Sequence, residues 1–280
     1  MAYSSSGLIE ATDYNGFAAS VNAVWGSGTG AAGYGQTNTL STVSASSTVT
    51  ATQWATLIAR IESMRQHQSG SASGLTQPSA GDTITFLSDL STQIGLITTN
   101  KDDNNVGVTQ LATANASGAT AWTSNAVREC KFTFSSANAM RYFFNAGGTI
   151  TCNTISSSFS GNTKSDNWDT IANATTATIN NTTFWDSLST SNFTVDTNTG
   201  SGADYGSNVL YLQARLDAAP GSSTEIIVRG YFVDGAGDGF DDNVTGTTRV
   251  DAAANGPTTT YLTNTWGTPT ATDNLTVTQS

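Results

Sequence analysis

The chain has 280 residues, of which 11% are charged and 37% hydrophobic, and its formal net charge is −11 at pH 7. It shows no basic cluster of the kind that binds DNA or RNA, and no apolar run approaches the roughly 18 residues of a membrane span. We therefore expect neither a nucleic-acid partner nor a membrane partner.

The polar residues are mostly uncharged, because Ser, Thr, Asn and Gln make up about 40% of the chain. Such a composition suits adhesins, surface-layer proteins and virion proteins, whose short strands and turns use Thr, Asn and Gly. Eleven Phe, 8 Tyr and 6 Trp supply too much buriable surface for a disordered chain. The first 16 residues lack the charged and apolar regions of a classical signal peptide. We therefore expect the protein to reach an extracellular setting only as part of something assembled in the cytoplasm.

Residues 1–108 predict a small helical region. Asp13 is expected to cap a helix over 14–25, and Thr50 with Gln53 fits a capping box at the start of a second helix. That second helix is expected to end before "SGSASG". A third helix is predicted over 84–100, with its apolar residues on one side.

A glycine run between the first two helices contains Gly28, Gly30 and Gly33, the literal spacing G-x-G-x-x-G. In dinucleotide-binding enzymes this run follows a strand, opens a helix and precedes an acidic residue by about 20 positions. Here a predicted helix precedes it, a Thr/Ser-rich stretch follows it, and no acidic residue occurs between Asp13 and Glu62. We therefore predict no nucleotide site, and expect the glycines to form a tight positive-φ connection anchored by Tyr34.

From about residue 109 the pattern becomes that of a β-rich protein, with residues 129–134 alternating as in a half-buried strand. The stretch 139–159 predicts a strand, a turn at Asn-Ala-Gly-Gly and a second strand. A short helix is expected over 168–172. Further strands are predicted within 208–218, 223–234, 247–254 and 274–280, separated by turn signals as in a β-sandwich.

The sequence therefore predicts an α+β fold. We expect a helical N-terminal region over 1–108, a β-rich middle region over 109–200 and the strands of a C-terminal β-sandwich over 201–280.

The acidic stretch "DGAGDGFDDNVT" resembles a calcium loop, with Asp234, Asp238 and Asp242 at liganding positions 1, 5 and 9. Position 3 is Ala236 and position 12 is Thr245, so the bidentate carboxylate is missing. The three aspartates are a candidate for weak calcium binding, and a solvated acidic hairpin loop is the alternative.

Other chemistry-bearing residues are sparse. Cys130 and Cys152, the only cysteines, both lie in predicted strands; a cross-strand disulfide is geometrically possible, but two reduced buried thiols are favoured. His67, the only histidine, lies near the end of the second predicted helix with no nucleophile motif nearby, and is expected at the surface or as a cap. We therefore expect no enzyme, no catalytic residue and no cofactor.

Several stretches together resemble virion structural proteins of tailed bacteriophages, most closely those of myovirus-type phages of cyanobacteria and marine bacteria. They are "YNGFAASVNAVWGSGTGAAGYGQ", "TATQWATLIARIESMRQHQSG", "FTFSSANAMRYFFNAGGTI", "VLYLQARLDAAPGS" and "TTYLTNTWGTP". The resemblance implies a component of the neck, tail or fibre apparatus, assembled in the host cytoplasm and located in the virion. Its partners would be other virion proteins and copies of itself, in a ring-like or threefold homo-oligomer.

Two alternatives stay open, a carbohydrate-binding or depolymerising host-recognition module and a bacterial surface-layer or adhesin protein. For self-association, the sequence suggests the helix faces that carry Phe17, Trp25, Trp54 and Ile61, and the stretch "MRYFFNAGG" as a further packing region. The same helix faces would instead be covered if they closed the bundle within one chain.

Overall fold

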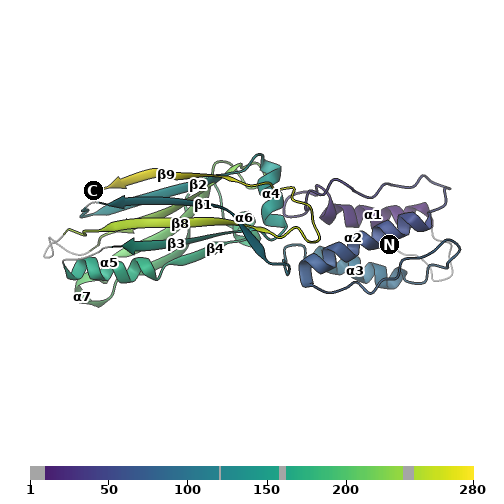
Figure 1. Cartoon of the computed structure of the whole chain (residues 1–280), viewed down its shortest axis with the longest axis horizontal. Coiled ribbons are helices and arrows are strands. Elements are labelled where there is room, and N and C mark those ends of the chain that lie inside the picture. The colour runs from purple at the N-terminus through teal and green to yellow at the C-terminus, as the bar shows by residue number, and fades with distance from the viewer. Residues whose placement is uncertain (1–9, 120, 158–161, 236–242) are drawn as a thin grey trace. The chain divides into compact units, whose positions relative to one another are not determined.

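The computed structural model describes residues 10–119, 121–157, 162–235 and 243–280. It has the expected α+β fold, with helices and two antiparallel sheets, and divides into two compact units (Figure 1). The helical unit contains the described residues up to Val108, together with Arg141–Gly147 and Pro257–Trp266. The sandwich unit contains Thr109–Met140, Gly148–Gly256 and Gly267–Ser280, except for the stretches that the structure does not describe.

The helical unit is built on α1 (Ala11–Trp25), α2 (Ala51–Ser69) and α3 (Leu87–Thr99), which contact one another pairwise. α2 begins with the predicted capping box, in which the Thr50 side chain accepts a hydrogen bond from the Gln53 backbone. The predicted cap of α1 is wrong. Glu10 is the N-cap residue, and Asp13 lies three positions later, where its carboxylate accepts a hydrogen bond from the Glu10 backbone N–H.

The apolar helix faces close the bundle within one chain. Phe17, Trp25, Trp54 and Ile61 are all at most 3% exposed. The rings of Phe17 and Trp54 lie 6.3 Å apart, and the Arg60 guanidinium lies 4.8 Å from the centre of the Trp25 ring. The expectation that these residues form a surface for self-association is therefore wrong, since packing inside the unit already covers them.

The predicted hairpin over 139–159 is also wrong in its first half. Residues Ala137–Asn145 form a helix, α4, and only the second half is a strand. Met140, Phe143 and Phe144 recur at helical spacing and are fully buried, and the Ser136 hydroxyl accepts a hydrogen bond from the Ala139 backbone N–H at the helix start. These buried side chains offer no exposed packing region.

The remaining elements belong to the sandwich unit, which carries every strand that the structure assigns. The described strands are β1 (Val108–Ala119), β2 (Asn125–Thr133), β3 (Thr149–Ser157), β4 (Thr176–Ile179), β5 (Phe193–Thr199), β6 (Val209–Leu216), β7 (Glu225–Val233), β8 (Thr247–Pro257) and β9 (Thr270–Gln279). Three helices lie between them: α5 (Thr163–Asn173), α6 (Asn181–Asp186) and α7 (Gly202–Tyr205).

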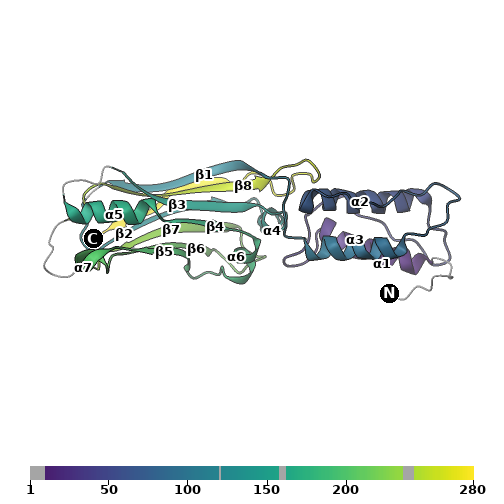
Figure 2. The same cartoon turned by 90° about the horizontal axis from the view of Figure 1, so that it is seen from below.

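The strands form a four-stranded sheet in the order β1-β8-β3-β4 and a five-stranded sheet in the order β5-β6-β7-β2-β9 (Figures 1 and 2). Each sheet combines strands from the middle part of the sequence with strands from the C-terminal part. β7 buries every second residue, including Ile226, Val228 and Phe232. Between them a Cβ atom on Gly230 would lie 2.4 Å from a methyl group of Val250 on β8, so glycine permits the close approach of the two sheets.

Hydrogen bonds from backbone N–H groups to side chains link the edge strands of the two sheets on both sides of the sandwich. On one side, Asp273 and Asn274 of β9 accept hydrogen bonds from the backbone N–H groups of Asn115 and Ser117 of β1. On the other side, Asp196 of β5 accepts one from Thr176 of β4. The pairing register shifts beside these aspartates in both edge strands of the five-stranded sheet, as it does at a β-bulge.

One end of the sandwich unit is closed by α5. Trp168 of this helix packs against Trp122 and Phe232, with ring centres 5.0 and 5.9 Å apart, and all three side chains are buried. The predicted short helix over 168–172 therefore exists and is longer than expected. Among the described residues, no helix has the length and apolar character needed to cross a membrane.

Candidate functional site

The glycine run adopts the predicted positive-φ conformation but presents the wrong groups for a phosphate. Gly28, Gly30 and Gly33 have φ values of +51°, +55° and +97°. Carbonyl oxygens of this loop accept hydrogen bonds from Arg141: one guanidinium nitrogen donates to Ser27 at 2.7 Å, and the other donates to Gly30 and Ala32.

Asn145, one turn further along α4, donates to the carbonyl oxygens of Gly30 and Gly33. A phosphate-binding loop instead points its backbone N–H groups at the ligand. A loop that offers its carbonyls to a guanidinium group is complementary to a cation. The run is therefore a structural connection that binds the end of α4, and sequence reasoning missed its partner because Arg141 lies more than 100 residues away.

Tyr34 anchors this connection as predicted. Its buried hydroxyl donates to the Lys101 carbonyl oxygen at 2.7 Å and accepts from the Gln68 amide at 2.8 Å. Burial, the main cause, raises the pKa of Tyr34 far above its usual value. The hydroxyl is therefore a permanent hydrogen-bond donor that holds α2 and the end of α3 to the loop.

His67 is fully buried in the helical unit, so its expected place at the surface is wrong. Its Nε2 lies 3.0 Å from the carbonyl oxygen of Ala146, which makes Nε2 the protonated nitrogen and the donor. Burial lowers the pKa of His67 to about 4, although the hydrogen bond to Ala146 opposes this shift. The side chain is thus neutral near pH 7 and serves as a tertiary contact between α2 and the turn after α4.

The candidate calcium residues are only partly within the described part of the chain. Asp238 and Asp242 lie outside it. Asp234 follows the last residue of β7, and its carboxylate is in contact with the ammonium group of Lys164, with only 2% of the side chain exposed. No group of three or more His, Cys, Asp or Glu suited to a metal ion occurs among the residues that the structure describes. Weak calcium binding by this loop stays a prediction.

The two cysteines are free thiols on facing sheets. Cys130 of β2 and Cys152 of β3 are both buried. Burial, with a smaller contribution from nearby negative charges, raises the pKa of each thiol to about 12. A buried thiol with a raised pKa carries little thiolate and is a poor nucleophile.

The hollows on the surface carry little chemistry. One of about 560 Å³ in the helical unit is lined by short polar and apolar residues around Trp54, and Glu10 is the one charged residue in its lining. Another, where β3 pairs with β4, is lined by threonines, Asn153, Cys152 and Ala177. Neither brings together an acid–base pair.

The outward side of the five-stranded sheet carries an ordered array of accessible functional groups. We call it the tyrosine face: Tyr211, Gln213 and Arg215 of β6, Ile227, Arg229 and Tyr231 of β7, and Val127, Glu129 and Lys131 of β2. All but Glu129 are partly exposed. The strand register aligns them in rows, so that Tyr211 lies opposite Tyr231 and Gln213 opposite Arg229. The alternation of apolar residues with Tyr, Gln and Arg within "NVLYLQARLDA" could have predicted this face from the sequence.

The tyrosine face is held rigid by its own contacts. The rings of Tyr211 and Tyr231 stack with centres 6.2 Å apart, and the guanidinium group of Arg229 lies 4.5 Å from the centre of Tyr231. Both terminal nitrogens of Arg215 bond the Glu129 carboxylate. Burial would raise the pKa of Glu129, but hydrogen bonds from Arg215 and Thr276 and the charges of Arg215 and Arg229 outweigh it and lower the pKa.

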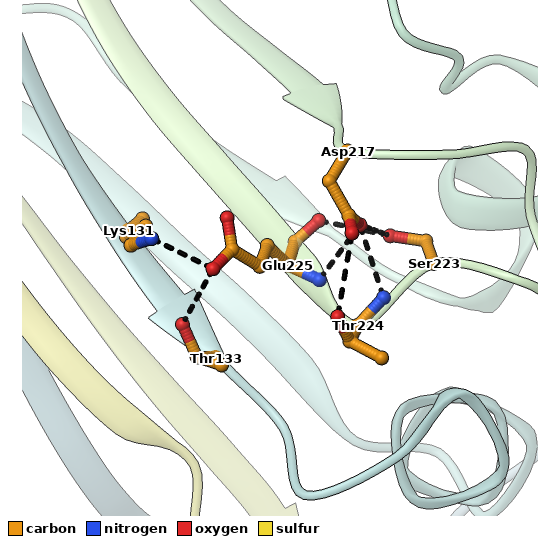
Figure 3. Close-up of polar contacts among 6 residues, drawn as sticks. All are labelled: Lys131, Thr133, Asp217, Ser223, Thr224 and Glu225. Carbon is orange, nitrogen blue, oxygen red and sulfur yellow. Dashed lines mark hydrogen bonds and ion pairs between the residues drawn. The ribbon is translucent and has the colours of Figure 1, made fainter.

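A polar cluster at one end of the face fixes the β6–β7 turn (Figure 3). Asp217 accepts hydrogen bonds from the Ser223 hydroxyl and from the backbone N–H groups of Thr224 and Glu225. Burial acts to raise the pKa of Asp217, but these hydrogen bonds lower it. Glu225 in turn accepts from Lys131 Nζ at 2.7 Å. Asp217 therefore acts as the organising residue of the turn.

Comparisons with known protein families, with curated proteins and with solved structures find no match to this chain.

Proposed function

We propose that this chain is a structural component of a tailed bacteriophage virion, in the neck, tail or tail-fibre apparatus, and that it acts by protein–protein assembly. The resemblance of several sequence stretches to such proteins points to this class. The uncharged polar composition and the many short strands are compatible with it.

The observation that carries the proposal is how the chain uses its functional groups. The side chains best suited to catalysis are buried: His67, Arg141 and the two cysteines. His67 and Arg141 form hydrogen bonds within the protein, and the cysteines are shielded by packing. The tyrosine face instead presents an ordered, accessible and rigid set of aromatic and charged side chains. Such a distribution suits a protein that works through a surface, because aromatic and arginine side chains dominate the energetics of interfaces.

Location in purified virions is the direct test. We expect peptides of this chain in the particle proteome and matching density at the neck, tail or fibres by cryo-electron microscopy. Absence from every purified particle of a phage that encodes the chain would overturn the proposal.

The role of the tyrosine face is tested in the same phage. Tyr231→Ala should reduce incorporation into particles, because it removes both the stacking on Tyr211 and the support for Arg229. Tyr261→Ala is the matched control, since Tyr261 is 37% exposed and belongs to the helical unit. Equal incorporation of both variants would show that the tyrosine face is not the assembly surface.

A carbohydrate-binding role is the second candidate, favoured by the accessible tyrosines beside arginine, glutamine and glutamate side chains on a flat sheet. Binding of the purified chain to host surface polysaccharide, lost in Tyr231→Ala and kept in Tyr261→Ala, would support this role. No binding to host polysaccharide would exclude it.

A further inference from the structure

Lys164 and Asp234 form an ion pair that is almost completely buried in the sandwich unit. The Lys164 Nζ and Asp234 Oδ2 atoms lie 2.5 Å apart, and the two side chains are 4% and 2% exposed. Taking both charges out of water costs several kcal/mol per ion, which the attraction between them repays only in part. A pair of this kind is therefore a poor source of stability as long as it stays ionic.

The position of Lys164 breaks a rule of helix design. It lies in the first turn of α5, directly after Asn162 and Thr163, where the helix dipole disfavours a cation. The spacing of Lys164, Trp168 and Ile171 places the lysine on the same buried face of the helix as the tryptophan. Local rules are typically broken where a residue has a function that the fold alone does not require.

Asp234 reaches the same interior from the sheet. It comes directly after β7 and follows Phe232 by two positions, and its side chain is buried like that of Phe232. Its backbone N–H donates to the Ser124 carbonyl oxygen at 2.8 Å, and the next residue, Gly235, donates to the buried Asn208 side chain. At the other partner, the N-cap Asn162 fixes the start of α5. Both reacting groups are thus held by backbone contacts before any reaction.

We propose that Lys164 and Asp234 condense to an intramolecular amide that crosslinks α5 to the end of β7. A proton first passes from the ammonium to the carboxylate, which gives a neutral amine and a neutral acid in a site from which water is excluded. The Nζ lone pair then attacks Cγ. The Nζ–Cγ bond forms, the bond from Cγ to the hydroxyl oxygen breaks, and this oxygen takes a proton from Nζ and leaves as water.

The condensation needs no oxidant, reductant or activated co-reactant. Two features drive it together: burial favours the uncharged amine and acid, and groups held in place react as if each were present at a very high effective concentration. The product removes both buried charges. It also closes residues 164–234 into a covalent loop, which lowers the entropy of the unfolded chain as a disulfide does.

The experiment is a mass measurement on the full chain, denatured after purification. We expect the mass of the sequence less one water molecule. Tryptic digestion should then yield one species in which peptide 142–215, uncleaved at Lys164, is joined to peptide 230–249. The joined peptides are essential, because a succinimide at Asp234-Gly235 would lose the same water without linking two peptides. An intact mass equal to that of the sequence, or water loss without joined peptides, would overturn the proposal.

Two comparisons sharpen the result. Asp234→Asn should give the same crosslinked product by loss of ammonia, whereas Lys164→Arg should give none. Lys131 and Glu225 form the internal control, because they are nearly as close, at 2.7 Å, but 21% and 26% exposed. We expect no joined peptides from that pair (Figure 3). A crosslink there of equal yield would show that burial is not what drives the reaction.

Discussion

Replacing His67 by glutamine should remove most of the stability change between pH 7 and pH 5. The wild-type chain buries this imidazole in its neutral form, with Nε2 donating to the Ala146 carbonyl oxygen. A glutamine amide can donate to the same oxygen and does not titrate in this range. The variant therefore separates the effect of protonation from the effect of the contact.

The magnitude follows from the lowered pKa of His67, which is about 4 in the folded chain against about 6.5 for an unperturbed histidine. Since the folded state resists protonation, the unfolded state binds more protons below pH 6.5, and stability falls as the pH falls. The loss between pH 7 and pH 5 is about 2 kcal/mol, and it approaches about 3 kcal/mol once the pH reaches the folded pKa. No other histidine titrates in this window, because the chain has only one.

The assay is urea unfolding at pH 7, 6 and 5, followed by far-ultraviolet circular dichroism. The three longest helices, α1 to α3, all belong to the unit that contains His67, so this signal reports on the relevant unit. We expect the wild-type free energy of unfolding to fall with pH and that of His67→Gln to stay nearly level. Equal losses in both proteins would refute the assignment of the pH dependence to this buried imidazole.

Three further predictions concern the glycine run, the tyrosine face and the acidic loop. Gly30→Ala should destabilise the helical unit by about 1–2 kcal/mol, which is the cost of a left-handed backbone for a residue with a Cβ. No steric cost is added, because nothing lies within 4 Å of the new Cβ. Gly33→Ala should lower the free energy of unfolding, measured by thermal unfolding, by about 3 kcal/mol, because its Cβ would lie 2.4 Å from the Ser27 carbonyl oxygen. An equal loss of stability in the Gly30→Ala and Gly33→Ala variants would contradict this reasoning. Glu129→Gln should lower the free energy of unfolding by about 2 kcal/mol at pH 7. The difference in stability between wild type and variant should shrink as the pH falls below the ordinary glutamate pKa and through the lowered pKa of Glu129. A difference that does not change with pH would contradict this. Calcium should bind only weakly by calorimetry, because Lys164 already holds the Asp234 carboxylate; submicromolar affinity would contradict it.

Helical periodicity and end signals were sufficient to predict the three long helices and the α+β class. The capping box at Thr50 is a local feature, so four residues carry all the information it needs. The strand predicted for the first half of 139–159 was wrong because its local pattern is ambiguous. Its run of Arg-Tyr-Phe-Phe is short, rich in aromatic residues and followed by a turn signal, which suits a strand as well as a helix.

The candidate site residues depended on contacts that no local pattern reveals. His67 is buried because Ala146, far along the chain, supplies its acceptor. The conformation of the glycine run can be predicted from its own residues. Arg141, which determines what the loop binds, lies on α4 and cannot be found from the loop sequence. The pairing of Lys164 with Asp234 likewise requires α5 and β7 to meet.

The side-chain hydrogen bonds along both sides of the sandwich restrict how copies of this protein can meet. An open strand edge invites another chain to extend the sheet, the route by which β proteins polymerise into fibrils. Here Asp273 and Asn274 occupy two donors of β1, and Asp196 occupies one of β4. At these positions the backbone N–H groups of β1 and β4 are therefore not available to a strand from another copy. If copies do associate, side chains of the sheet faces and loops, which differ from one protein to another, would have to supply the contacts at these positions in place of backbone groups.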